Sequence, residues 1–188
     1  MAEVLLFHHA LGLTDGCLAF ADDLRSAGHT VHTPDLFKGE RFASVDHGVA
    51  HAEAIGFGAI LERGRLAAEA LPAELAYVGF SLGVMPAQML AQTRPGARAA
   101  VLVHAAVALD EFGGTWPAGV PLQLHTMADD EWGDAEVARA LAAAIPEAEL
   151  YLYPGDRHLF TDRGTDDHDP AAAALVLDRV VDLLGRLD

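Results

Sequence analysis

A serine flanked by glycines is the feature of this sequence that points most directly to chemistry. The segment 79–83 (GFSLG) follows an apolar run, Leu75 to Val78, and precedes an amphipathic run. This G-x-S-x-G spacing between a strand and a helix is typical of a nucleophile elbow, a sharp turn in which neighbouring segments leave no room for Cβ atoms. Because a serine hydroxyl is a weak nucleophile at neutral pH, Ser81 also requires a histidine base and an orienting acid later in the chain.

Candidates for the acid and the base lie in two later loops, in the order that a serine nucleophile requires. Asp130 stands in a carboxylate-rich loop after the fifth of six predicted strands, and His158 stands in a glycine-containing loop after the sixth. Asp129 is the main alternative acid, because a loop carboxylate in an acidic chain is usually only solvated. His104 and His125 fall on or at the end of predicted strands, where histidines of the core are commoner than catalytic ones.

The elements that would position these residues alternate along the chain. Short apolar runs predict strands and longer amphipathic runs predict helices, which is the pattern of a parallel sheet with helices on both faces. The predicted strands are 3–8, 29–33, 75–80, 99–104, 121–125 and 149–153, and the predicted helices are 15–27, 45–70, 83–93, 134–144 and 170–187. Four glycines within 45–70 weaken that helix and predict a kink or break. Asp134 and Pro170 are expected to begin the last two helices. We expect one α/β domain over residues 1–188, with no room for a lid.

Composition restricts the classes of function. The chain has 28 acidic and 12 basic residues and a formal charge of −16, which disfavours nucleic acids and anionic membranes as partners. One cysteine, Cys17, excludes an internal disulfide. The apolar run at the N-terminus is too short for a signal peptide, and no segment is long enough to span a membrane, so a cytoplasmic location is expected. We expect a monomer or homodimer without a cofactor or metal ion.

Beyond these patterns, the sequence resembles the dienelactone hydrolase family of α/β-hydrolases over nearly its full length. The likeness is carried by residues 7–14 (FHHALGLT), 33–39 (TPDLFKG), the serine motif, the spacing from 125 to 130, and the 158–160 segment (HLF). The resemblance implies a compact α/β-hydrolase fold in which Ser81 is the nucleophile, Asp130 the acid and His158 the base. It also implies an oxyanion hole formed by the backbone N–H groups of Leu82 and Ala10.

Two positions depart from the pattern of that family. Its members resemble this chain except that they carry cysteine at the elbow and glutamate where His9 stands. The resemblance leaves His9 two roles, a hydrogen bond near the oxyanion hole or the orientation of its own loop. Members that cleave dienelactone also hold the substrate carboxylate with an arginine four residues after the catalytic histidine. Asp162 occupies that position, and an acid there is expected to repel an anionic substrate.

These observations predict hydrolysis of small neutral esters, lactones or thioesters through an acyl-serine intermediate. Acyl transfer to an alcohol uses the same intermediate. Aromatic residues in edge loops suggest an open, apolar pocket; the candidates are Phe37, Phe42, Phe112, Trp116, Trp132 and Phe160, with His9 beside them. An alternative is a catalytically silent α/β-hydrolase-fold module for ligand binding or regulation. A third interpretation is a metal site from His47 and His51, which are four residues apart, with help from His8 or His9, although two surface histidines are the commoner explanation.

Overall fold

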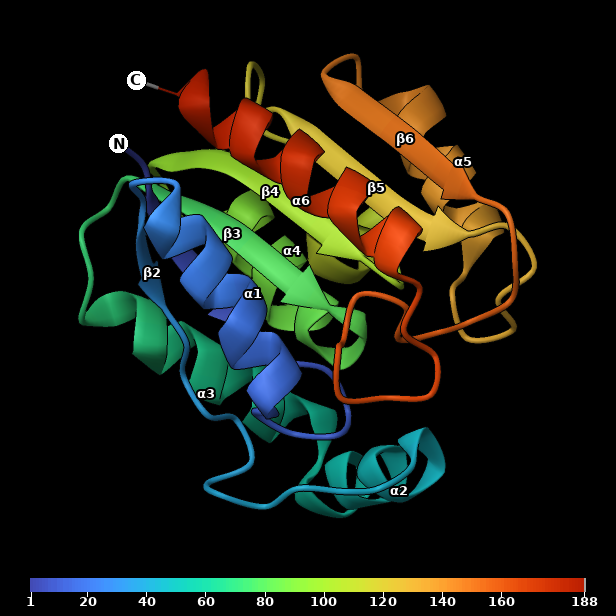
Figure 1. Cartoon of the computed structure of the whole chain (residues 1–188). Helices are drawn as coiled ribbons and strands as arrows, with labels where there is room; N and C mark the ends of the chain where they lie inside the picture. Colours follow the sequence, from blue (N-terminus) through green and yellow to red (C-terminus); the bar gives the residue numbers. More distant parts are fainter. Residues whose placement is uncertain (188) are drawn as a thin grey trace.

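A six-stranded parallel sheet organises the chain, and the computed structural model describes residues 1–187 (Figure 1). The strands are β1 (Glu3–Phe7), β2 (Thr30–His32), β3 (Leu75–Phe80), β4 (Ala97–Val103), β5 (Leu122–Met127) and β6 (Ala148–Tyr153). Their order in the sheet is β2-β1-β3-β4-β5-β6, and every neighbouring pair is parallel. The helices are α1 (Asp15–Ser26), α2 (Val45–Ile55), α3 (Phe57–Glu69), α4 (Val84–Thr93), α5 (Ala135–Ala144) and α6 (Pro170–Gly185). The predicted α/β class with helices on both faces is confirmed.

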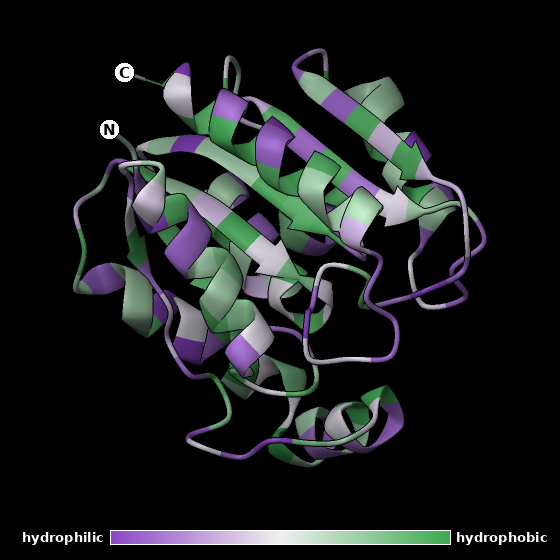
Figure 2. Ribbon diagram, viewed as in Figure 1, coloured by the Kyte–Doolittle hydropathy of each residue, from purple (hydrophilic) through white to green (hydrophobic). Residues whose placement is uncertain are grey.

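Helices cover both faces of the sheet because its strands are apolar on both sides, as Figure 2 shows for the central strands. In β1, Val4 and Leu6 pack with α1 and α6, whereas Leu5 and Phe7 pack with the helices on the opposite face. A parallel sheet is stable only when both faces are buried in this way. The apolar runs in the sequence therefore predicted the strands to within one or two residues.

The predicted helix 45–70 is two helices, so its expected break is present. Gly56 ends α2 and begins α3 with φ of 89°, a conformation that glycine adopts without the steric cost of a Cβ. Asp134 occupies the N-cap position of α5, as predicted. Its backbone is left-handed, φ 47°, and its side chain does not make the capping hydrogen bond that aspartate usually makes there. Pro170 does begin α6, behind Asp169, whose carboxylate caps Ala171 and Ala172.

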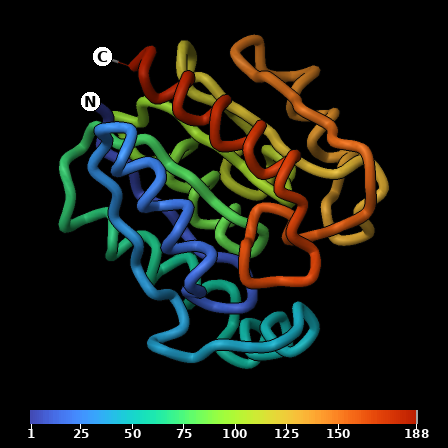
Figure 3. Tube along the Cα trace, viewed as in Figure 1, coloured from blue at the N-terminus to red at the C-terminus, as the bar shows by residue number. Residues whose placement is uncertain are grey.

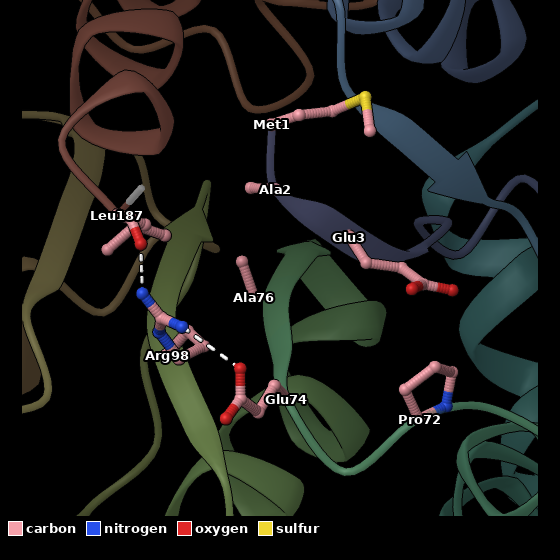
Figure 4. Close-up of a pocket in the computed structure, with 8 residues that line it drawn as sticks. All are labelled: Met1, Ala2, Glu3, Pro72, Glu74, Ala76, Arg98 and Leu187. Atoms are coloured by element: carbon pink, nitrogen blue, oxygen red, sulfur yellow. Dashed lines mark hydrogen bonds and ion pairs between the residues drawn. The ribbon is translucent and has the colours of Figure 1, made fainter.

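The carboxyl ends of the parallel strands form one edge of the sheet and their amino ends form the opposite edge. Different segments of the chain lie at these two edges. The chain trace brings the loops after β1, β3, β5 and β6 to the carboxyl edge of the strands, whereas both termini lie at the opposite edge (Figure 3). A cavity of about 330 Å³ at that opposite edge is lined by the starts of β1 and β4, and there Arg98 bridges Glu74 and the backbone of Leu187 (Figure 4). Within residues 1–187, no helix is long and apolar enough to cross a membrane.

Candidate active site

Ser81 lies at the turn between β3 and α4. Its φ is 48°, a left-handed conformation that is uncommon for residues other than glycine, and a short 3₁₀ turn, Ser81–Gly83, leads into the helix. A Cβ on Gly79 would lie 2.4 Å from the carbonyl oxygen of Gly83, and one on Gly83 would lie 2.4 Å from that of Phe7. Both glycines are therefore required by close backbone approach. A left-handed conformation such as that of Ser81 costs on the order of 1–3 kcal/mol, and backbone strain of this size is concentrated at functional sites.

Three predicted residues meet at the carboxyl edge in a continuous chain of hydrogen bonds. The Oγ of Ser81 lies 2.7 Å from Nε2 of His158, and Nδ1 of His158 lies 2.7 Å from Oδ2 of Asp130. His158 and Asp130 are 5% and 7% exposed, so little water competes for these bonds. Because the ionised Asp130 can only accept, Nδ1 carries the proton of a neutral His158 ring and Nε2 accepts from the Ser81 hydroxyl.

The loop after β5 selects Asp130 over its neighbour. The backbone N–H of Trp132 donates to Oδ1 of Asp130 at 2.9 Å, which leaves Oδ2 for His158. A Cβ on Gly133 would lie 2.7 Å from that same Oδ2, so glycine is needed beside the acid. Asp129 is exposed, and its backbone N–H donates to the carbonyl of Gly155. The alternative left open by the sequence is thus decided by geometry in favour of Asp130 as the partner of His158.

The two residues expected to provide oxyanion-hole amides are both buried. Leu82 follows Ser81 and is 8% exposed, and Ala10 is 1% exposed. Tight packing fixes Ala10, because a Cβ on Gly48 of α2 would lie 1.9 Å from the Ala10 carbonyl oxygen. The elbow and the loop after β1 are also in contact, since Gly83 packs on the carbonyl groups of Phe7 and His8.

His9 bonds a residue that the sequence placed in a different role. Nε2 of His9 lies 2.7 Å from Oδ2 of Asp162, and both side chains are buried. Asp162 also accepts from the Thr14 hydroxyl at 2.6 Å and from the Gly164 N–H at 2.7 Å. The expectation that Asp162 presents its charge to the substrate is therefore corrected: the carboxylate is 3% exposed and is held by three donors of this chain.

The surroundings of this second pair shift its pKa values in opposite directions. Burial raises the pKa of Asp162, but the hydrogen bonds from His9, Thr14 and Gly164 outweigh it and lower the pKa to about 2. Burial lowers the pKa of His9, but Cys17 and then Asp162 outweigh it and raise the pKa to about 9. In the neutral ring, Nδ1 accepts from the Leu11 N–H at 3.3 Å. In either charge state Nε2–H is donated to Asp162.

Sequence reasoning missed Cys17 as a neighbour of this pair. Within residues 1–187, His9, Cys17 and Asp162 form the one group whose donor atoms, all within 4.8 Å of one another, could hold a metal ion. Hydrogen bonds already join the His9 and Asp162 atoms of this group. His47 and His51, the pair considered for a metal from the sequence, do not belong to it.

The aromatic residues expected at the pocket are divided between core and rim. Phe37 and Phe160 are 2% and 0% exposed and lie in the core, where Phe160 packs edge-on against His104. Trp116 is half-buried and donates its indole N–H to the Val120 carbonyl. Trp132 alone of these four combines large exposure, 47%, with proximity to His158, whose ring centroid is 6.2 Å away.

Comparison with known proteins places this arrangement in a family. The sequence model of the dienelactone hydrolase family matches residues 1–187. The chain belongs to the dienelactone hydrolase family. Solved structures with the same fold include a dienelactone hydrolase-like promiscuous phosphotriesterase from metagenomic libraries, with a TM-score of 0.81 and 20% identity over 100% of this chain and 87% of the other. A dienelactone hydrolase from Anabaena variabilis gives 0.70 and 17% over 98% and 86%.

An esterase is also among the structural neighbours of this family member. The chain matches a cold-adapted esterase from an Arctic intertidal metagenomic library with a TM-score of 0.67 and 17% identity, over 96% of this chain and 82% of that one. No curated protein matches the chain. At these identities the solved structures establish the α/β-hydrolase fold, and the family match establishes a hydrolase family.

Two neighbouring cavities lie at the carboxyl edge in this family member, and one of them is lined by Asp130 and His158 of the hydrogen-bonded chain. One, of about 440 Å³, lies beside His158 and Trp132, and the other, of about 530 Å³, lies beside Thr14 and Asp162. Both are lined in part by Val45 and Asp167, so they are neighbours at the carboxyl edge. Acidic residues dominate the first cavity, and its lining residues include neither lysine nor arginine: Val45, Asp129, Asp130, Glu131, Trp132, Asp156, His158 and Asp167.

Proposed function

We propose that this protein is a serine hydrolase that cleaves small neutral carboxylic esters, lactones or thioesters through an acyl-serine intermediate. The observation that carries the proposal is the chain of two 2.7 Å hydrogen bonds from Ser81 through His158 to Asp130, in a member of a hydrolase family. An activated serine hydroxyl is the requirement for acyl transfer to the enzyme, and a cavity of about 440 Å³ lies beside the proposed base and acid.

The geometry supports a specific sequence of proton transfers. Nε2 of His158 takes the hydroxyl proton as Oγ of Ser81 attacks the substrate carbonyl, and Asp130 stabilises the imidazolium that forms. The carbonyl electrons move to oxygen, and we assign the N–H groups of Leu82 and Ala10 to that oxyanion. His158 then protonates the leaving group as its bond to carbon breaks. A water molecule, deprotonated by His158, repeats the attack on the acyl-serine and releases the acid.

The charge of the adjoining cavity supports neutral substrates. Asp129, Glu131, Asp156 and Asp167 line it together with the acid Asp130, and the lining includes no lysine or arginine to pair with a substrate carboxylate. Carboxylates held close together in a partly desolvated cleft repel an anionic ligand and tolerate a neutral or cationic one. Trp132 provides an apolar surface at the rim for an acyl or alkoxy group.

The decisive experiment is labelling of Ser81 combined with turnover. We expect wild-type protein to hydrolyse a short aryl ester and to gain one fluorophosphonate adduct by intact mass, with the label mapped to Ser81. Ser81→Ala should do neither. Ser26→Ala, which changes an exposed serine at the end of α1, is the matched control and should behave as wild type. Equal ester hydrolysis by wild type and Ser81→Ala would refute the proposal, and an unlabelled, inactive wild type would favour the silent module.

A further inference from the structure

The loop that carries Ala10 packs on α2 and is also held by a buried pair. His9 directly precedes Ala10, and its ring reaches the loop between β6 and α6 to bond Asp162 at 2.7 Å. Asp162 lies four residues after His158, in the same loop. The pair therefore joins the segment of the proposed oxyanion donor to the segment of the proposed base.

Other contacts make the position of the Asp162 carboxylate specific. Thr14, the N-cap of α1, donates to the same Oδ2 that His9 bonds, and the N–H of Gly164 donates to Oδ1. A Cβ on Gly16 would lie 1.7 Å from Oδ1, so the first turn of α1 accommodates the carboxylate only because that residue is glycine. Figure 1 shows the loop between β6 and α6 beside this end of α1. The negative charge also lies at the positive end of the helix dipole.

Burying a charged group is costly unless its partners are well placed, and a pair of this kind is more informative about position than about stability. The Ser81 chain of hydrogen bonds does not use His9 or Asp162. The bond between His9 and Asp162 instead affects the position of the backbone between this pair and the elbow. That backbone includes the N–H of Ala10.

We propose that His9 and Asp162 are positioning residues that fix the Ala10 N–H, through the 2.7 Å bond between the two loops, at the site where the oxyanion of the reaction develops. This proposal rests on the serine hydrolase function proposed above. It answers why a histidine stands beside the oxyanion loop and why an acid follows the base by four residues. Neither side chain touches the substrate.

The expected effect is on the transition state. Loss of an oxyanion donor costs about 10²- to 10³-fold in kcat, and misplacement by about 1 Å costs about 10²-fold. Asp162→Asn replaces one of two accepting oxygens by an NH₂ group, so either Gly164 or the pair of His9 and Thr14 loses its acceptor. We expect kcat for a short aryl ester to fall about 10- to 100-fold with KM changed less than about 3-fold.

A second measurement distinguishes a loss of positioning from a general loss of structural order. Affinity for a trifluoromethyl ketone, whose tetrahedral adduct carries an oxyanion, should fall in Asp162→Asn by the same factor as kcat. Affinity for the corresponding alcohol, which has no oxyanion, should not change. His9→Gln, which can still donate to Asp162, should retain most of the activity, whereas His9→Ala should resemble Asp162→Asn.

Glu3→Gln is the matched control. It makes the same carboxylate-to-amide change in another histidine–carboxylate pair, His32 with Glu3 at 2.9 Å, at the opposite end of β1, and should leave kcat unchanged. A folded Asp162→Asn with kcat within twofold of wild type would overturn the inference while wild-type turnover still supports the hydrolase. If Asp162→Asn does not fold, equal kcat for folded His9→Ala and His9→Gln overturns it, and a selective loss in His9→Ala supports it. A wild type without turnover or Ser81 labelling refutes both proposals.

Discussion

Two histidine–carboxylate pairs lie at the same edge of the sheet, and their hydrogen bonds have the same length. His158 bonds Asp130 at 2.7 Å and His9 bonds Asp162 at 2.7 Å, and all four side chains are buried. They differ at the other nitrogen of each ring. Nε2 of His158 faces the Ser81 hydroxyl beside a cavity, whereas Nδ1 of His9 faces the backbone N–H of Leu11.

The difference teaches that residue types and distances do not by themselves distinguish chemistry from support. A base needs a second nitrogen that is free to take a proton from a reacting group. Nε2 of His158 faces the Ser81 hydroxyl, whereas neither ring nitrogen of His9 faces a group assigned to the reaction. The roles that we propose for the same two residue types therefore differ: proton transfer for His158 with Asp130, and the position of a loop for His9 with Asp162.

The largest expected effect comes from the same substitution made in each pair. His158→Gln removes the base and should lower kcat by about 10⁴-fold or more, as loss of a triad histidine does elsewhere. His9→Gln keeps a donor for Asp162 and should retain at least about a third of wild-type kcat, since the bond between the loops is preserved. Steady-state kinetics with one aryl ester measures both.

Folding of both variants is checked by circular dichroism. If His9→Gln lost as much activity as His158→Gln while folded, the distinction between the two pairs would be wrong.

The next largest effect compares the two adjacent acids. Asp130→Asn should lower kcat about 10³- to 10⁴-fold, because an asparagine NH₂ group can donate to Nδ1 of His158. The ring would then carry its proton on Nε2, which could no longer accept the proton of Ser81. Asp129→Asn changes an exposed side chain and should stay within twofold. The ratio of the two kcat values is the measurement. A larger loss in Asp129→Asn would exchange the roles assigned to the two residues.

The sequence predicted the sheet and the Ser81 chain of hydrogen bonds because both depend on local pattern. Apolar runs of strand length encode a sheet buried on both faces, and the glycines around Ser81 encode the elbow. The serine motif supplied the order of acid and base, and the resemblance to the family assigned those roles to Asp130 and His158. Side chains from the loops after β5 and β6 then come together with Ser81 because parallel strands bring their carboxyl ends to one edge.

Contacts between distant loops could not be predicted in the same way. The pairing of His9 with Asp162 joins residues 153 positions apart, and no periodicity links them. Phe37 and Phe160 occur in loops but are buried, since the fate of a loop aromatic depends on which segments cover it. The left-handed Asp134 likewise follows from the turn that precedes α5, which overrides the capping preference of aspartate.

A buried histidine without a carboxylate among its hydrogen-bond partners provides a contrast to both pairs. His125 bonds the Tyr153 hydroxyl and the Gln123 side chain. Burial and then the nearby Arg179 lower its pKa to about 3. Because the pKa in the unfolded chain is 6.5, the unfolded state binds more protons between these values, so stability is complete above pH 6.5 and is lost as the pH falls.

We expect His125 to account for a loss of about 3 kcal/mol in the free energy of unfolding between pH 6.5 and pH 4. Urea denaturation at a series of pH values measures it. His125→Gln has no proton to gain, so its stability should fall less steeply over this range. Identical slopes for the two proteins would contradict the assignment of a buried neutral ring.

The smallest expected effect tests the second pair without changing either of its members. Gly16→Ala adds a Cβ that would lie only 1.7 Å from Oδ1 of Asp162, so the carboxylate or the first turn of α1 must move. We expect kcat to fall about 3- to 10-fold with KM nearly unchanged, and stability to fall by about 1–3 kcal/mol from overpacking.

The control is Gly58→Ala in α3, where a Cβ meets nothing within 4 Å, and it should raise stability by up to about 1 kcal/mol without changing kcat. Since Gly16 contacts neither Ser81 nor His158 through a side chain, a kcat loss confined to Gly16→Ala would show that displacement of Asp162 is felt at the reacting centre. Unchanged kcat in a measurably destabilised Gly16→Ala would instead separate the pair from catalysis and leave it a contributor to stability alone.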